Sequence, residues 1–278
     1  MSSALNVCVA GATGWTGSAL AAAVADADDL VLRCAVSRSR AGDELYGAPV
    51  HATVVEALYA AGDVDVLIDY TSHDVVRGHT LAAIERGVGV VVGTSGLTAA
   101  DFEEIQAVAE ARGVGVVAAG NFSITAALAQ AAALLAARHI PQWEIIDYAS
   151  ATKPDAPSGT ARELAERLAE VRRPELALPV EETAGERAAR GATIGGTQVH
   201  SLRLPSFTVS TEVVFASPDE RLSIRHDAGG SASPYVAGTL LAARAVPALR
   251  GLVRGLDTLL LAQAPESAGA DSGVRADP

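Results

Sequence analysis

Among the residues that could do chemistry, one lysine is unusual. Lys153 is the only lysine in a chain that also has 20 arginines. An ammonium group is a compact charge that can give up a proton, whereas a guanidinium stays charged, so a single retained lysine indicates a specific role; a surface lysine left by chance is the alternative. Shortly after it, Gly159 and Thr160 open a predicted helix capped by Ser158. Free amides at a helix start bind carboxylates, so this segment predicts a small anionic substrate.

A glycine-rich loop lies near the N-terminus, directly after an apolar run and before a helical segment. Small residues let backbone amides approach a pyrophosphate, and the positive end of the helix dipole faces its charge. The spacing is G-x-x-G-x-x-G, and its position between strand and helix gives it weight as a dinucleotide site. The predicted phosphate-binding residues are Gly11, Ala12, Thr13, Gly14, Trp15 and Thr16.

The end of the second apolar run indicates which dinucleotide binds. An NAD site places Asp or Glu there, but this chain has Ser37-Arg38-Ser39-Arg40. Guanidinium and hydroxyl groups suit a 2′-phosphate, so we expect NADP(H) to be preferred, with NAD(H) still possible. Arg38 is the expected main anchor. Arg40 is a secondary one, and the alternative that it only solvates the loop stays open.

Short β-branched runs alternate with alanine-rich segments over residues 5–122. The runs 5–10, 30–36, 64–70, 88–93 and 114–119 are almost continuously apolar, as is typical of strands covered on both faces. Segments 18–28, 75–86 and 98–112 have helical composition, and Thr98 with Asp101 forms an approximate capping box. The pattern predicts an α/β fold, a Rossmann-type doubly wound parallel sheet.

The pattern changes after residue 123. Helices at 124–139 and 160–173, with strands at 143–148, 197–204, 207–216 and 221–227, predict a second domain of α+β type with an antiparallel or mixed sheet. A final helix at 234–246, which 251–263 could continue, is expected to pack back on the first domain. We therefore predict a dinucleotide-binding domain (1–122 plus 233–263), a substrate-binding domain (123–232) and a disordered tail (264–278).

Composition excludes several kinds of partner. The formal charge is −12, and the basic residues are scattered singly, so no nucleic acid partner is expected. Residues 113–137 carry no charge, but a Gly-Asn-Phe-Ser break interrupts them and no aromatic belt frames them, so no membrane partner is expected. Cys8 and Cys34 have no metal-type spacing, and the N-terminus has no basic head typical of a secretory signal. We expect no metal and a cytoplasmic location.

Four segments together resemble the dihydrodipicolinate (4-hydroxy-tetrahydrodipicolinate) reductase family of lysine and diaminopimelate biosynthesis. They are GATGWTG at 11–17, GTSG at 93–96, GNFS at 120–123 and KPDAPSGTA at 153–161. The resemblance implies an NADPH-dependent reductase with a substrate domain that forms homotetramers. It implies that Lys153 donates a proton or polarises the substrate, and that Gly159 and Thr160 bind a carboxylate. It also implies a nicotinamide site lined by Gly93, Thr94, Ser95, Ala119, Gly120, Asn121 and Phe122.

The chain departs from the family in the loop before Lys153. Family members usually carry Glu-Ala-His-His-x-x-x-Lys, and this chain has Asp147-Tyr148-Ala149-Ser150-Ala151-Thr152-Lys153. The general-acid position is therefore Ala149, which has no proton to give, and the neighbouring substrate-binding position is Ser150, which can only hydrogen-bond. Loss of a positioned acid typically removes about 10²–10⁴-fold in rate. Lys153, Tyr148 and water remain as possible donors.

Three functions compete. The first is an NADPH-dependent reductase of a cyclic or imine-like dicarboxylate, of the dihydrodipicolinate reductase type. The second is a related reductase of a different imine or carbonyl compound, with a pocket reshaped by Ala149 and Ser150. The third is a non-catalytic sensor that binds NADPH. The retained Lys153 and Pro-Ser-Gly-Thr segment argue against a sensor, because a protein without an anionic ligand has no use for them.

Overall fold

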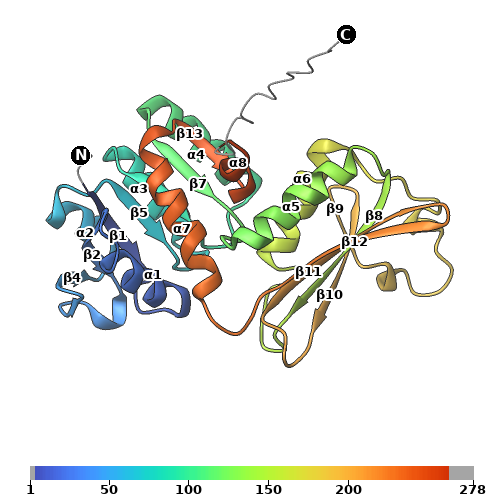
Figure 1. Cartoon of the computed structure of the whole chain (residues 1–278), viewed down its shortest axis with the longest axis horizontal. Helices are drawn as coiled ribbons and strands as arrows, with labels where there is room; N and C mark the ends of the chain where they lie inside the picture. Colours follow the sequence, from blue (N-terminus) through green and yellow to red (C-terminus); the bar gives the residue numbers. More distant parts are fainter. Residues whose placement is uncertain (1–3, 263–278) are drawn as a thin grey trace, which may run out of the picture.

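The computed structural model describes residues 4–262, which form two lobes, each built on one sheet (Figure 1). The sheet of the first lobe has the strand order β13-β7-β6-β5-β1-β2-β4-β3, and its pairs are parallel except for β3 with β4. The strands are β1 (Leu5–Ala10), β2 (Leu30–Val36), β3 (Glu44–Leu45), β4 (Ala48–His51), β5 (Val66–Asp69), β6 (Gly89–Val92), β7 (Gly115–Ala118) and β13 (Gly251–Arg254). This order confirms the doubly wound fold, and its direction reverses between β1 and β5, the place where such sheets bind ligands.

Helices cover both faces of this sheet, which explains why its strands are apolar on both sides. Alternate strand residues show the division: Val7 and Val9 pack toward one face, while Cys8 and Ala10 pack toward the other. The first face is covered by α1 (Trp15–Ala25), α7 (Ser233–Ala245) and α8 (Leu256–Ala262), and the second by α2 (Val54–Ala61), α3 (Val76–Glu85) and α4 (Ala99–Arg112). The predicted capping box of Thr98 and Asp101 is present at the start of α4.

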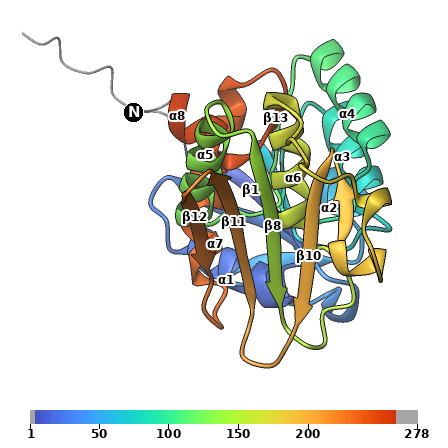
Figure 2. The same cartoon turned by 90° about the vertical axis from the view of Figure 1, so that its right-hand side faces the viewer.

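The second lobe is a mixed five-stranded sheet with helices on one face. Its order is β12-β11-β8-β10-β9; β8 and β10 are parallel, and the other pairs are antiparallel. Figure 2 shows the opposite, open face, with α5 and α6 behind the strands. The elements are α5 (Ile124–Ala137), β8 (Gln142–Ala149), α6 (Gly159–Val171), β9 (Ala192–Ile194), β10 (Thr197–Arg203), β11 (Val209–Ser217) and β12 (Glu220–Asp227).

Residues on β8 alternate between the two faces of this sheet. Trp143, Ile145, Asp147 and Ala149 are buried, and the first two pack with the core residues of the helices. The residues between them are only half-buried and lie on the open face. Consequently Ala149 and Tyr148, neighbours in the sequence, project to opposite sides.

Several elements differ from the prediction. Residues 251–263 do not continue the last helix, because 251–254 form edge strand β13 beside β7 and only then does α8 begin. Helix α1 begins at Trp15 rather than 18, and β3, β4 and α2 were not predicted. Short 3₁₀ turns lie at Arg38–Arg40, Val180–Glu182, Arg187–Arg190 and Val246–Ala248. The predicted tail, 264–278, lies outside the described residues.

The uncharged stretch 113–137 is divided between two elements. Its first part forms β7 in the first lobe, the break at 120–123 crosses between the lobes, and the rest forms α5 in the second. Within residues 4–262, no helix has both the length and the apolar character needed to span a membrane.

Candidate active site

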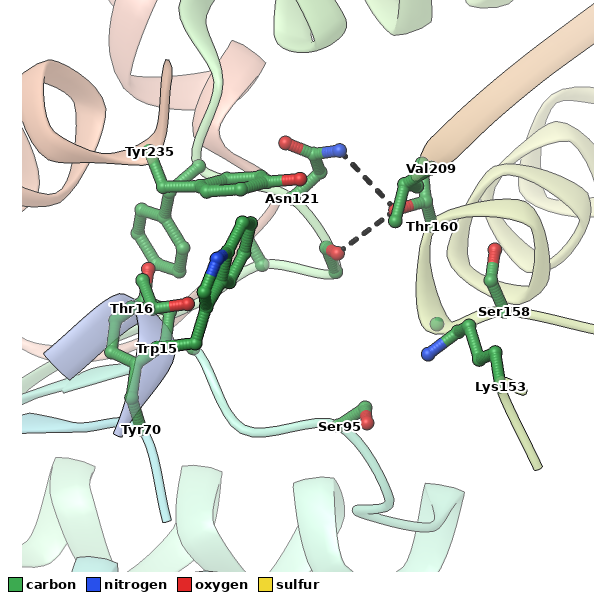
Figure 3. A pocket seen from close by; sticks show the side chains of 15 residues that line it. Trp15, Thr16, Tyr70, Ser95, Asn121, Lys153, Ser158, Thr160, Val209 and Tyr235 are labelled. Atoms are coloured by element: carbon green, nitrogen blue, oxygen red, sulfur yellow. Dashed lines mark hydrogen bonds between the residues drawn. The ribbon is translucent and has the colours of Figure 1, made fainter. Parts of the chain in front are cut away.

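A pocket between the two lobes, called here the interlobe pocket, collects most of the predicted site residues (Figure 3). The first lobe contributes the start of α1, the loops after β5, β6 and β7, and the start of α7. The second lobe contributes the Lys153 loop, the start of α6 and β11. Its lining consists of Trp15, Thr16, Tyr70, Gly93, Ser95, Ala119, Gly120, Asn121, Phe122, Lys153, Ser158, Gly159, Thr160, Val209 and Tyr235.

The start of α1 is suited to a phosphate group. Gly14 is its N-cap without a side-chain cap, and the first turn has no acidic residue. Gly11 has a φ of +79°, and a Cβ on it would lie 2.2 Å from the carbonyl oxygen of Tyr70. Only glycine therefore allows β1 to turn into α1 so close to β5. Ala12 is buried with its amide bonded to Val36, and Thr13 bonds through its hydroxyl to Ser37, 2.7 Å away.

A second pocket, the β2 pocket, lies at the carboxyl end of β2. It is lined by Gly11 and Gly14 of the glycine loop, by Arg38 with its neighbours Ser37 and Ser39, and by residues after β4 and β5. Arg38 is exposed there. Arg40 instead pairs with Asp43 at 2.5 Å, so its guanidinium is already engaged. The β2 pocket therefore offers hydroxyl groups beside the Arg38 guanidinium, which pairs with no carboxylate among residues 4–262.

Thr94 takes part in a buried network rather than in the interlobe pocket. Its hydroxyl lies 2.8 Å from Asp69 Oδ1 and accepts a hydrogen bond from the Thr71 amide. Asp69 is fully buried at the end of β5, and His79 Nδ1 lies 2.8 Å from its other carboxylate oxygen. This network ties together the loops that follow β5 and β6.

The loop after β7 is packed against the start of α6. The hydroxyl of Thr160 donates to the carbonyl of Gly120 at 3.1 Å, and the Asn121 amide donates to Thr160 at 3.3 Å. A Cβ on Gly120 would lie 2.7 Å from the Gly159 carbonyl, so the two lobes can approach this closely only at glycine. Phe122 is buried against Tyr70, with ring centroids 6.1 Å apart.

Lys153 is held within reach of this pocket by its own loop. Its ammonium lies 2.8 Å from Asp155, and the side chain is 28% exposed; Figure 3 shows it directed toward the first lobe. The fully buried Asp147 accepts hydrogen bonds from the amide and the hydroxyl of Ser158, at 2.9 and 2.7 Å. Arg203 donates both to Asp147 and to the Asp155 carbonyl, which fixes the loop relative to the helix start.

The predicted catalytic residue Tyr148 and the predicted substrate-binding residue Ser150 do not line the interlobe pocket. Tyr148 lies on the open face of the second sheet, where its hydroxyl donates to Glu212 at 3.1 Å and Arg225 lies over its ring. Ser150 bonds to Thr152 within the loop. Strand alternation removes Tyr148 from the pocket, because Ala149 occupies the inward position. Ala149 is fully buried, and none of the six histidines lines the interlobe pocket.

Besides Ser158, which was predicted only as a helix cap, three lining residues were not among the predicted site residues. Tyr70 follows β5, Val209 begins β11 opposite Ala149, and Tyr235 lies in the first turn of α7. Burial raises the pKa of both tyrosines, so both phenols stay protonated near neutral pH. Within residues 4–262, Lys153 is the only residue with an ionic side chain that lines the interlobe pocket. The position of Tyr70 after a strand at the reversal point was the one available signal.

A buried acidic group lies behind the start of α6. The Gly120 amide donates to Glu163 Oε2, and the Gln130 amide donates to Glu163 Oε1 at 3.1 Å. Desolvation by burial nevertheless raises the pKa of Glu163. Gln130 also donates to Asp257 of α8, which forms a two-bond ion pair with Arg167 of α6. These contacts join α5 and α6 of the second lobe to α8 of the first.

Comparisons with known proteins identify relatives that match almost the whole chain. The 4-hydroxy-tetrahydrodipicolinate reductase of Moorella thermoacetica is 37% identical over 268 residues, covering 94% of this chain and 99% of the relative. That of Mycolicibacterium smegmatis is 37% identical over 257 residues, covering 92% and 99%. A dipicolinate-bound dihydrodipicolinate reductase from Paenisporosarcina sp. TG-14 superposes with a TM-score of 0.75 at 28% identity, covering 92% of this chain and 99% of that one.

More distant structures share the fold alone. An amine dehydrogenase from Mycobacterium smegmatis superposes with a TM-score of 0.60 at 15% identity, covering 91% of this chain and 95% of that one. The family model described as dihydrodipicolinate reductase, N-terminus, matches residues 5–122, and the one described as dihydrodipicolinate reductase, C-terminus, matches residues 120–260. The resemblance seen in the sequence is confirmed, and the chain belongs to the dihydrodipicolinate reductase family.

Proposed function

We propose that this chain is an NADPH-dependent reductase of a small cyclic, imine-like dicarboxylate, of the 4-hydroxy-tetrahydrodipicolinate reductase type that serves lysine and diaminopimelate biosynthesis. One observation carries the proposal. Lys153 and the start of α6 line the interlobe pocket from the second lobe, while Trp15, Tyr70 and Gly93 line it from the first. A site for an anion thus faces the predicted nicotinamide site, and the relatives named above support the reaction type.

The residues present fit a bound dinucleotide. The uncapped start of α1 and the close passage at Gly11 suit a pyrophosphate, and the β2 pocket suits a ribose phosphate. When bound, NADPH supplies a hydride to an electron-poor C=N or C=C bond of the substrate. We assign the 2′-phosphate to Arg38, assisted by Ser37 and Ser39, since Arg40 is paired with Asp43.

The second lobe positions the acceptor. Amides at the start of α6, where Ser158 caps the helix and the first turn has no acidic residue, can bind one carboxylate. The Lys153 ammonium can bind a second anionic group and stabilise negative charge as it develops during hydride transfer. Protonation is assigned to Lys153 or to water, since Tyr148 faces the other side of the sheet.

Turnover of 4-hydroxy-tetrahydrodipicolinate, generated in place and followed by NADPH oxidation, tests the proposal. We expect Lys153→Met to lower kcat/KM by about 10²–10³-fold, and Lys153→Arg to restore only part of the loss because a planar guanidinium does not replace a point donor. Asp155→Asn is the matched control, because it changes the charge of the same loop by one unit and leaves Lys153 in place. Absence of turnover by the wild-type chain, or full activity of Lys153→Met, contradicts the proposal.

A related reductase of a different imine is the second candidate. The observation that favours it is the apolar inward surface where family members usually carry histidine: Ala149 is fully buried and Val209 lines the pocket beside it. A substrate with an apolar group at this point would be better accommodated here than a substrate that needs a hydrogen bond from histidine. Normal NADPH binding with negligible turnover of the dicarboxylate, followed by turnover in a panel of cyclic imines, would favour this candidate.

We also propose a cytoplasmic homotetramer assembled through the open face of the second sheet. That face carries Leu202, which is 36% exposed, beside the half-buried Ile146 and Val214. Burial of such side chains favours association. Light scattering coupled to gel filtration measures the mass, and Leu202→Glu is expected to shift it toward smaller species.

A further inference from the structure

Tyr235 is buried on the first-lobe side of the interlobe pocket. It lies in the first turn of α7 and is 8% exposed, and the edge of its ring meets Trp15, with centroids 5.9 Å apart and planes at 65°. Trp15 in turn begins α1, directly after the glycine loop. The ring is therefore fixed by packing against the element that begins the predicted cofactor site.

The hydroxyl of Tyr235 has no hydrogen-bond partner in the part of the chain that the structure describes. Two other phenols of this protein are satisfied: Tyr70 bonds to Thr239 at 2.8 Å and Tyr148 to Glu212 at 3.1 Å. The Tyr235 ring is buried, but its hydroxyl is not among the fully buried polar atoms that lack a partner, so the oxygen remains accessible to a ligand in the interlobe pocket. Figure 3 shows the hydroxyl end of Tyr235 directed into the space between the lobes, near Asn121.

The hydroxyl is a donor rather than an acid. Burial raises the pKa of Tyr235, so the phenol keeps its proton at neutral pH. On the opposite wall, Lys153 and the start of α6 favour an anion. An oxygen of an anionic ligand placed between the two walls would satisfy the hydroxyl.

We propose that the Tyr235 hydroxyl donates a hydrogen bond to an oxygen of the dicarboxylate substrate, which makes Tyr235 a substrate-binding residue supplied by the first lobe. This inference rests on the proposed function. The substrate is then held from both lobes at once, by Lys153 and α6 on one side and by Tyr235 on the other. The pocket gains a specificity element at a point where no histidine is present.

Calorimetric titration with dipicolinate, in the presence of saturating NADPH, tests the inference on Tyr235→Phe. The substitution keeps the ring and its contact with Trp15, so only the donor is lost. A hydrogen bond to a charged group contributes roughly 1.5–3 kcal/mol, so we expect dipicolinate binding to weaken about 10- to 100-fold. NADPH affinity should stay within about twofold. Tyr59→Phe is the matched control, because Tyr59 is 77% exposed on α2.

The possible outcomes separate the two proposals. Selective loss of dipicolinate affinity in Tyr235→Phe, with Tyr59→Phe unchanged, supports the inference. Equal dipicolinate affinity in Tyr235→Phe and wild type overturns it while leaving the proposed function intact. Loss of NADPH affinity instead overturns the inference, because it indicates that the Tyr235 hydroxyl bonds to the cofactor. A wild-type chain that binds no dipicolinate overturns both the inference and the proposed function.

Discussion

His79 Nδ1 lies 2.8 Å from Asp69 Oδ2, so an imidazole on α3 holds a fully buried carboxylate at the end of β5. The other carboxylate oxygen accepts from the hydroxyls of Thr71 and Thr94, at 2.6 and 2.8 Å. Asp69 thus connects two loops beside the predicted cofactor site to one helix behind it. The position of these loops depends on His79, although His79 lines only the β2 pocket.

We predict that His79→Leu both destabilises the protein and weakens cofactor binding. Loss of the imidazole leaves a buried carboxylate oxygen without its partner, at a cost of about 1–3 kcal/mol. The Asp69 carboxylate, which orients Thr71 and Thr94, is then held less firmly, so the KM for NADPH rises. Urea denaturation and steady-state kinetics measure the two effects. His73→Leu is the control, because the His73 side chain is 73% exposed. An unfolding free energy equal to that of wild type would contradict this role for His79.

Arg38→Ala should separate the two dinucleotides. Because a charge-assisted hydrogen bond contributes about 1.5–3 kcal/mol, we expect NADPH to bind roughly 10- to 100-fold more weakly, and NADH to change by less than about threefold. Fluorescence titration measures both dissociation constants. Arg40→Ala should leave both almost unchanged, since Arg40 is paired with Asp43. Equal losses for NADPH and NADH would show that Arg38 does not bind the 2′-phosphate.

Tyr148→Phe should leave kcat within about twofold of wild type. Its hydroxyl donates to Glu212 on the open face of the second sheet, away from the interlobe pocket. The lost bond is partly exposed, so the unfolding free energy should fall by about 0.5–1.5 kcal/mol. Kinetics and thermal unfolding of the same preparation distinguish the effects. A large loss of kcat with unchanged stability would restore Tyr148 as a proton donor.

Glu163 should make stability depend on pH. Burial raises the pKa of Glu163, so the folded protein binds this proton more tightly than the unfolded chain does. The contribution of Glu163 is therefore fully present below the ordinary glutamate pKa of the unfolded chain, and it is lost as pH rises through the folded-state pKa.

Glu163→Gln removes this ionisation while keeping one oxygen that can accept from the Gly120 amide. We expect the Tm of wild type to fall relative to that of Glu163→Gln as pH rises above the glutamate pKa of the unfolded chain. Calorimetric scans at several pH values between about 4 and 8 measure this difference. A constant difference across the range would mean that Glu163 titrates alike in both states.

The sequence predicted the framework of the first lobe well, because its strands are buried on both faces. The bounds of β1 and β2 were predicted to the residue, because each strand coincides with an almost continuous apolar run in the sequence. Strand β13 was missed because Gly251–Arg254 is short and apolar, and only its position beside β7 makes it a strand rather than a helical turn.

Site residues could be predicted only where they belong to a sequence motif or follow the end of a predicted strand. Lys153, Gly159 and Thr160 belong to one continuous segment, so the sequence brought them together without knowledge of the fold. Tyr235 lies in the apolar pattern of a helix. Nothing in the neighbouring sequence distinguishes a tyrosine that faces a pocket from one that packs in the core. Its place depends on how α7 packs against α1, which local sequence does not encode.

The ion pair between Arg167 and Asp257 has a consequence for how the protein is made. The ribosome delivers α5 and α6 well before α8, so both helices emerge while their partner carboxylate is still untranslated. Until Asp257 is translated, Gln130 and Arg167 lack the carboxylate that joins them to the first lobe. The nascent chain can therefore form the second lobe before the first is complete, because α7, β13 and α8 of the first lobe are translated last. The alignment of the two lobes is completed only late in biosynthesis.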